Sequence, residues 1–412
     1  MKKLVSDLSV TGKKVLVRVD FNVPHKGENV TDDNRIKAAI PTIADLLKKN
    51  AKVILMSHLG KIKWGKVDDA EIENEKKKND LKIALPALKS HLATALGHEV
   101  NVSFSEATRG ESLKAAVDAL KDGEVLLVQN TRYEKGETKN NAELSAEWAS
   151  LCDAYVMDAF GSAHRAHSST VGVPTILASE GKETAVGYLV EKEINNLGRC
   201  VNCPEDGHPY VAILGGSKVS DKIQVIDSLL KKCDKILIGG GMAYTFLAAK
   251  GQKIGNSLFE ADQVEYAKNC LATGKVLVPV DNVIADSFDD PKDIKTVDGD
   301  IPEGYLGLDV GPKTVELFHK EILAAKTIFW NGPMGVFENE KFANGTKAVC
   351  AACAEATKAG AFSAIGGGDS ASAAKQFGYA ADFSHVSTGG GASLELIQFD
   401  GHLPGIDDIQ DK

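Results

Sequence analysis

The chain has 412 residues, of which 43% are hydrophobic and 25% charged, as in folded proteins of two or three globular domains. Its 48 basic and 57 acidic residues give a net charge of −9, which excludes the dominant positive field that nucleic-acid and anionic-membrane binders need. No apolar run approaches the ~20 residues that cross a bilayer, and no apolar stretch follows the first two lysines, so neither a membrane span nor a secretory signal is expected.

Short apolar runs alternate with amphipathic helical patterns along almost the whole chain. Most runs are continuous in Val, Ile and Leu, which is typical of strands buried on both faces of a parallel sheet. The alternation therefore predicts an α/β fold with two doubly wound parallel-sheet domains. The predicted strands lie within residues 14–21, 51–58, 99–104, 124–130, 154–160, 210–216, 235–241, 275–283, 327–333 and 361–368, and examples of the helical patterns are 81–97, 111–123 and 222–234.

A helical pattern at residues 183–199 separates two sets of strands, and helix-breaking residues are frequent on both sides of it. We therefore expect an N-terminal domain at 1–182, a connecting helix at 183–199 that acts as a hinge, and a C-terminal domain from residue 200. The highly charged segment 64–80 is expected to be a solvated surface loop.

The strand ends of the first half carry basic and polar side chains. Ligands of open α/β sheets bind beyond the carboxyl ends of the strands, and guanidinium groups match phosphate or carboxylate oxygens in pairs. Several such groups at one rim indicate a pocket for a small polyanion. The residues concerned are Asp20, Asn22, Arg35, His58, Arg132, His164 and Arg165.

The strand ends of the second half are rich in glycine. Glycine lets the backbone approach a ligand closely, and a helix that begins after such a turn directs N–H groups at phosphate oxygens. One of these turns carries Lys218, and another carries Asp369 and Ser370, so a nucleotide site is predicted here. None matches the P-loop pattern or a clear dinucleotide-binding GxGxxG. A cationic half and a nucleotide half together favour phosphoryl transfer.

Two other protein classes fit a two-domain α/β pattern less well. A nicotinamide dehydrogenase predicts GxGxxG followed by an acidic residue about 20 positions on, and this is missing. A two-lobed solute-binding protein predicts an export signal, which is not evident.

Seven cysteines are few and odd in number, so the reducing cytoplasm is the expected compartment. Cys200 with Cys203, and Cys350 with Cys353, have CxxC spacing. A metal or redox role stays open for both pairs, but small core residues are favoured because four zinc ligands in closing geometry are not evident.

Ten ordered motifs resemble those of the phosphoglycerate kinase family, from residue 18 to the end of the chain. They are RVDFNVP, SHLG, NTRYEKGE, DAFGSAHRAHSS, LGGSKVSDK, GGGMAYTF, GLDVGPKT, FWNGPMGVFE, GGGDS and TGGGASLE, and LPGIDDIQDK follows at the terminus. The resemblance implies a monomeric hinge enzyme of glycolysis. Such an enzyme reversibly transfers a phosphoryl group between 1,3-bisphosphoglycerate and ADP, giving 3-phosphoglycerate and ATP, without a nucleic-acid or membrane partner.

The resemblance also implies roles for individual residues. The N-terminal domain would bind the glycerate through Asp20, Asn22, Arg35, His58, Lys61, Arg132 and Arg165. The C-terminal domain, 200–395, would bind the nucleotide through Lys222, Gly307, Asn331, Glu338, Gly366, Gly367, Gly368, Asp369 and Ser370, with Asp369 as the Mg²⁺ ligand. The tail, 396–412, would return to the N-terminal domain.

Two features depart from the family pattern. Lys61 stands where the family usually has arginine, which keeps the charge but loses the planar fork. The segment 62–80 is longer and more charged than expected, and it could shield the cleft or be a simple loop insertion.

The implied reaction needs charge control more than acid–base chemistry. Its nucleophile is a carboxylate, which is already ionised at pH 7, so no general base is required. Arg35 and Lys218 are predicted to stabilise the transition state. His58, His164 and His167 could be acid–base residues or hydrogen-bond donors, and a carboxylate nucleophile favours donors.

Overall fold

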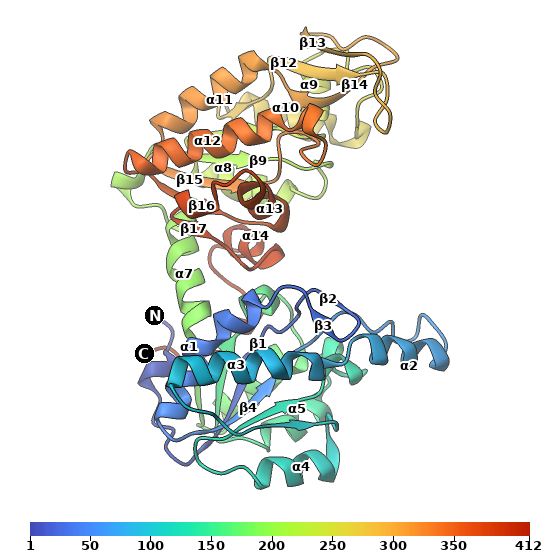
Figure 1. The fold of residues 1–412 in the computed structure, drawn as a ribbon. Coiled ribbons are helices and arrows are strands. Elements are labelled where there is room, and N and C mark those ends of the chain that lie inside the picture. Colours follow the sequence, from blue (N-terminus) through green and yellow to red (C-terminus); the bar gives the residue numbers. More distant parts are fainter. The chain divides into compact units, whose positions relative to one another are not determined.

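The computed structural model describes all residues from Met1 to Lys412. The chain divides into two compact units: the first comprises Met1–Ile194 and His402–Lys412, and the second comprises Asn195–Gly401. Each unit contains a six-stranded parallel sheet with helices packed against it (Figure 1). This architecture confirms the predicted fold class.

The sheet of the first unit has the strand order β5-β6-β4-β1-β7-β8. Because β1 lies between β4 and β7, the chain extends the sheet in both directions from β1, and ligands bind at such points in open sheets. The strands are β1 (Lys14–Val19), β4 (Lys52–Met56), β5 (Val102–Ser105), β6 (Val125–Val128), β7 (Ala154–Asp158) and β8 (Glu183–Val186), and a separate hairpin pairs β2 (His25–Lys26) with β3 (Asn29–Val30).

The helices of the first unit cover this sheet with apolar faces. In α1 (Asn34–Lys48), Ile36, Ile40, Ile43 and Leu47 recur at helical spacing, and all four are buried in one cluster with the β1 and β4 side chains. The other helices are α2 (Asp69–Lys78), α3 (Leu85–Leu96), α4 (Gly110–Asp118), α5 (Ala142–Ala149), α6 (Val173–Ser179) and α15 (Pro404–Asp407), and α7 (Tyr188–Val201) continues from this unit into the second.

The two ends of the chain meet in the first unit. The backbone N–H of Lys412 donates to the carbonyl of Met1 over 2.9 Å, and that of Gly405 donates to Ala163 over 2.8 Å. Thr184 Oγ1 accepts from the backbone N–H of Gln410 over 3.0 Å. The segment that belongs to the first unit begins at His402, six residues after the predicted start of the tail.

The second unit repeats the doubly wound plan with the order β11-β10-β9-β15-β16-β17. Its strands are β9 (Tyr210–Leu214), β10 (Lys235–Ile238), β11 (Val276–Leu277), β15 (Thr327–Asn331), β16 (Phe362–Ile365) and β17 (His385–Val386). Its helices are α8 (Ile223–Lys232), α9 (Ala243–Ala249), α10 (Val264–Ala272), α11 (Pro312–Ala324), α12 (Asn344–Lys358), α13 (Gly368–Gln376) and α14 (Gly391–Gln398).

The single strand predicted at 275–283 is wrong. Residues 276–277 form β11 in the parallel sheet, whereas β12 (Asp281–Ala285) begins a separate antiparallel sheet with β13 (Ile294–Asp298) and β14 (Leu306–Val310). Pro279 lies between the two strands, and proline has no N–H group to donate to a sheet ladder.

The continuous helix predicted at 183–199 is also corrected. Residues 183–186 form β8, which pairs with β7, and the helix α7 begins only at Tyr188. Thr184, Ala185 and Val186 are buried at this sheet edge, so the gain from strand pairing and burial outweighs the helical pattern.

The charged segment 64–80, expected to be a loop, contains α2 (Figure 1). The Asp68 side chain caps this helix by accepting from the backbone N–H of Glu71 over 2.8 Å. Acidic residues occupy its first turn and Lys76, Lys77 and Lys78 its last, an order that complements the helix dipole.

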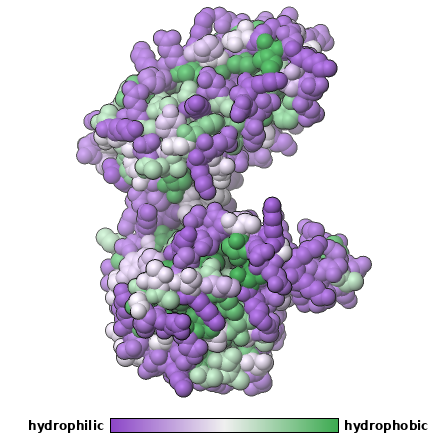
Figure 2. Space-filling view, viewed as in Figure 1, coloured by the Kyte–Doolittle hydropathy of each residue, from purple (hydrophilic) through white to green (hydrophobic).

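Figure 2 shows hydrophilic residues over most of the visible face of each unit. No helix combines the length and the apolar composition that crossing a membrane requires.

Candidate functional site

In the first unit, predicted site residues follow the carboxyl ends of the central strands. Asp20 comes directly after β1, and its carboxylate is ion-paired with Arg35 on the first turn of α1. Asn22 Oδ1 accepts from the backbone N–H of Gly60 over 2.8 Å, which ties the loop after β1 to the loop after β4. The structure therefore brings these residues together at the switch point of the sheet.

The loop after β4 is fixed by neighbouring side chains as well. Asn130 accepts from the N–H of Leu59 over 3.1 Å and donates to the Leu59 carbonyl over 2.7 Å. The Arg132 guanidinium, on η3 (Thr131–Tyr133) after β6, donates to the carbonyl of Gly60. Arg132 is thus held beside the His58 loop before any ligand arrives.

Positive charge accumulates at this rim. Burial, followed by the nearby Arg18, lowers the pKa of Arg132 to about 10, and the Arg132 Nε atom is buried without a hydrogen-bond partner. Burial and the charges of Arg18, Arg132 and Arg35 hold the pKa of His58 well below its usual range. An anion that reaches these groups would relieve their mutual repulsion.

Arg165 and Lys61 lie at the exposed margin of the cluster. Arg165 follows η5 (Phe160–Ser162), and its charge adds to burial in lowering the pKa of both His164 and His167. Lys61 is exposed, and its carbonyl accepts from the Asn79 amide over 3.4 Å.

The segment with α2 supports Arg132 from outside. The indole Nε1 of Trp64 donates to the Arg132 carbonyl over 2.9 Å, and the Lys76 ammonium lies 5.2 Å from the centre of the Trp64 ring. The Tyr133 hydroxyl donates to the Lys76 carbonyl. The inserted segment is therefore fastened to the strand end that carries Arg132.

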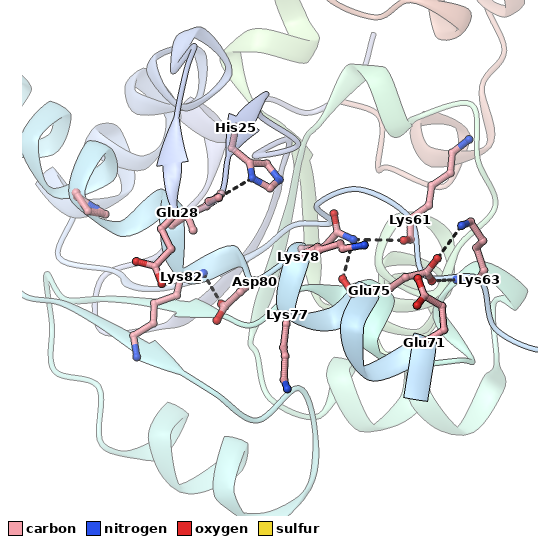
Figure 3. A pocket seen from close by; sticks show the side chains of 14 residues that line it. His25, Glu28, Lys61, Lys63, Glu71, Glu75, Lys77, Lys78, Asp80 and Lys82 are labelled. Carbon is pink, nitrogen blue, oxygen red and sulfur yellow. Dashed lines mark hydrogen bonds and ion pairs between the residues drawn. The ribbon is translucent and has the colours of Figure 1, made fainter. Parts of the chain in front are cut away.

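A cavity of about 1070 Å³ lies between this segment and the β2–β3 hairpin, and of the predicted site residues only Lys61 lines it (Figure 3). Its lysines do not converge, since Lys61 points upward in Figure 3, whereas Lys77 and Lys82 extend downward from separate places. Lys63 is already paired with Glu75 over 3.0 Å. The cavity is therefore not the polyanion pocket that the sequence predicts.

In the second unit, four glycine-rich turns, after β9, β15, β16 and β17, line a cavity of about 310 Å³. Gly367 has a φ of 111°, and a Cβ there would lie 2.3 Å from the Asn331 amide nitrogen, so only glycine fits. The Lys222 ammonium donates to Asn331 Oδ1, and the Asn331 amide donates to the Gly366 carbonyl. The N–H of Gly332 donates to Ser370 Oγ over 2.6 Å.

Charge in this cavity comes from a few side chains. Burial lowers the pKa of Lys222, while Asp221 and Asp369 act in the opposite direction. Lys218 is exposed and lines the same cavity, and Asp369 lies on the first turn of α13. Backbone N–H groups at the start of α13 add partial positive charge.

A second cavity of about 660 Å³ adjoins these turns, because Gly216, Ser217, Pro333 and Asp369 line both. Gly307 and Glu338 line it, together with an apolar wall formed by Tyr244, Leu258, Phe288, Leu306, Leu308 and Val336. A Cβ on Gly307 would lie 2.1 Å from the Tyr244 hydroxyl, so this position also needs glycine. The site thus combines a polar end with an apolar slot.

The sequence did not reveal two features of these sites, the buried charged residues of the first and the apolar wall of the second. Arg18 is only 1% exposed and Glu137 is fully buried, and both belong to motifs that were otherwise used. A charged residue inside a continuous apolar strand was the available signal for Arg18. The apolar wall had no comparable signal, because its residues come from separate loops and strands.

The cysteine pair on α12 is part of the core. Cys350 and Cys353 are both fully buried, and burial raises the pKa of Cys350 to about 12. These thiols are poor nucleophiles in that environment.

The shifted pKa of His167 predicts a dependence of stability on pH. Burial, then the nearby arginines, lowers it to about 4, whereas an unfolded histidine titrates near 6.5. Between these values the unfolded chain binds the proton and the folded chain does not, so the free energy of unfolding falls as the pH falls. Urea unfolding of the parent and of His167→Gln at pH 7.5 and 5.0 should show a smaller loss in the variant, by on the order of 1 kcal/mol. Equal losses would contradict the assignment.

Comparisons with known proteins agree with this geometry. The family model described as phosphoglycerate kinase matches residues 5–400. The phosphoglycerate kinases of Listeria welshimeri and Fusobacterium nucleatum are each 52% identical to the chain, with complete coverage of both sequences. The solved structure of phosphoglycerate kinase from Coxiella burnetii superposes with a TM-score of 0.84 at 36% identity, covering 99% of each chain. That from Pyrococcus horikoshii has a TM-score of 0.78 at 30% identity, covering 100% of this chain and 98% of the other.

These matches confirm the predicted activity, a phosphoryl transfer with a carboxyl group as acceptor, and show that the chain belongs to the phosphoglycerate kinase family.

Proposed function

We propose that the first unit binds 3-phosphoglycerate and that the second unit binds the nucleotide. The observation that carries this assignment is the difference between the two sites. One gathers guanidinium and imidazole side chains, and the other offers glycine turns, a helix N-terminus and an apolar slot.

3-Phosphoglycerate has a phosphate at one end and a carboxylate at the other, so it needs cations along its length. Arg132 and Arg165 would pair with phosphate oxygens of the substrate, and Arg35 would pair with the reacting carboxylate. Asp20 and Asn22 lie beside Arg35 and offer oxygen atoms to the substrate hydroxyl. Lys61, at the exposed margin, adds charge without a bidentate contact.

The nucleotide fits the two adjoining cavities of the second unit. The base would occupy the apolar slot beside Gly307, and Glu338 at the slot would accept from a ribose hydroxyl. The phosphates would lie along Gly366–Ser370, where N–H groups at the start of α13 point outward. Lys222 and Asn331 fix this turn from behind.

Members of this family typically use Mg²⁺. No group of three or more His, Cys, Asp or Glu side chains is arranged to hold a metal ion. A single protein carboxylate is enough for Mg²⁺ at a nucleotide, because the ion usually takes one or two carboxylates and completes its shell with phosphate oxygens and water. We assign Asp369 as the carboxylate, since it lines both cavities. The bound ion would neutralise phosphate charge.

The transfer itself needs no general base in this arrangement. The attacking carboxylate is ionised at neutral pH, and the low pKa of His58 and of His167 keeps both imidazoles neutral. Arg35 and Lys218 would stabilise the charge that spreads over the transferring group. The histidines then act as hydrogen-bond donors.

Because donor and acceptor bind to different units, in-line transfer requires the units to approach each other, with α7 as the connecting element. Exclusion of water would also protect the acyl phosphate. Each site is complete within one chain, so we propose a monomer. Small-angle X-ray scattering should give the mass of one chain, and a smaller radius of gyration with both substrates than without ligand. An unchanged radius would argue against closure.

A coupled assay with ATP and 3-phosphoglycerate tests the residue assignments. Arg35→Ala and Asp369→Ala should each lower kcat about 10²–10³-fold, the usual cost of removing one group that stabilises transition-state charge. Lys89→Ala, on the exposed face of α3, is the matched charge-removing control and should retain parental activity. A folded but inactive parent, or full activity in both site variants, would refute the proposal.

A further inference from the structure

Four buried polar residues behind the proposed phosphoglycerate site form one continuous hydrogen-bonded chain. Glu137 and Ser169 are fully buried, Arg18 is 1% exposed and His58 is 7% exposed. Two of these residues bear full charges, and the mechanism above uses neither. Buried charges are costly unless they are paired and hydrogen-bonded, so their arrangement calls for a physical role.

The first link joins Glu137 to Ser169, which lies in the π-helical turn η6 (Ser168–Gly172). Glu137 Oε2 accepts from the backbone N–H of Ser169 over 2.9 Å, and Oε1 accepts from the Ser169 hydroxyl. The hydroxyl proton is therefore committed to the carboxylate. This leaves the lone pairs of Ser169 Oγ available to a donor on the other side.

That donor is Arg18. Its Nε lies 2.8 Å from Ser169 Oγ, and its Nη1 donates to the carbonyl of Val19 over 2.5 Å. Its Nη2 lies 3.1 Å from Nδ1 of His58. A guanidinium has no lone pair and only donates, so His58 Nδ1 is the acceptor and the proton of the neutral ring is on Nε2.

We propose that Glu137 is a positioning residue, which holds Arg18 through Ser169 and thereby fixes His58 as the neutral Nε2–H tautomer that donates to an oxygen of 3-phosphoglycerate. The identity of the acceptor rests on the proposed function, whereas the tautomer does not. His58 itself touches the substrate, and Glu137 acts only through the two residues between them.

The charges that face His58 explain why this tautomer matters. Burial and then the charges of Arg18, Arg132 and Arg35 hold the pKa of His58 well below its usual range, so a second proton on the ring is disfavoured. A proton on Nδ1 would also meet an N–H of Arg18 head-on. A ring fixed with Nε2–H gives an anion a directed hydrogen bond that does not depend on pH near neutrality and adds no further positive charge to the cluster.

The tautomer can be read directly from ¹⁵N chemical shifts of histidine-labelled protein without ligand. The parent should show a His58 ring protonated on Nε2 and neutral from pH 8 down to pH 5.5. Glu137→Gln removes the charge and the carboxylate that orients Ser169, so Arg18 should lose its fixed position and His58 should show a mixture of tautomers. Ser169→Ala removes the hydroxyl that joins Glu137 to Arg18, so it should change the His58 tautomer in the same way. It also provides the test if Glu137→Gln does not fold.

Tyr155→Phe is the matched control. The Tyr155 hydroxyl is fully buried and donates to the carbonyl of the same Ser169 over 2.8 Å, but it lies outside the chain that reaches His58. Loss of this hydroxyl should leave the His58 tautomer unchanged. An effect seen in Glu137→Gln but not in Tyr155→Phe would then come from positioning of Arg18 and not from a general loosening of the core.

Kinetics provide the second readout. Glu137→Gln should raise the KM for 3-phosphoglycerate about tenfold, the worth of one hydrogen bond to a charged group, and leave the KM for ATP unchanged. Tyr155→Phe should leave both within about twofold. A parent His58 protonated on Nδ1, or a tautomer that is unchanged in both Glu137→Gln and Ser169→Ala, would overturn the inference. An inactive parent with the expected tautomer would instead refute only the proposed function.

Discussion

Like-charge repulsion is the constraint around which the first unit is organised. Burial and the charges of Arg18, Arg132 and Arg35 together lower the pKa of His58, and burial also lowers the pKa of Arg132, which Arg18 lowers further. The fold tolerates this concentration because Asp20 pairs with Arg35 and because Glu137 lies behind Arg18. The remaining positive charge is available to a substrate with two anionic ends.

The second unit is suited to an anionic ligand through main-chain N–H groups rather than through a cluster of cationic side chains. Its glycine turns bring the main chain close to the ligand space, and Gly367 and Gly307 each approach a neighbour too closely for any side chain. Main-chain N–H groups bind phosphate without adding net charge, so a few side chains suffice for charge balance. A site that needs few cationic side chains is compatible with a chain whose net charge is −9, even though the nucleotide ligands are anionic.

Much of this organisation was predictable from the sequence, because parallel strands in an α/β sheet leave a strong local signal. Continuous apolar runs located the central strands, and the residues after them gave the two candidate sites. The prediction was wrong where tertiary contacts decide: residues 183–186 pair with β7 although their pattern is helical, and Pro279 divides one apolar run between two sheets. The support that Trp64 gives Arg132 depends on a contact between distant segments and had no sequence signal.

The glycerate and nucleotide assignments came from a family resemblance as well as from residue chemistry, and they stay proposals at the level of single residues.

Hydrogen–deuterium exchange with each ligand alone tests the division between the two units most directly. 3-Phosphoglycerate should slow exchange in peptides covering residues 20–35, 57–61 and 130–137, and should leave the glycine turns at 214–222 and 365–372 unchanged. ADP with Mg²⁺ should produce the reverse pattern. Protection of the arginine-bearing loops by ADP, or glycine turns that exchange equally fast at saturating nucleotide, would contradict the account.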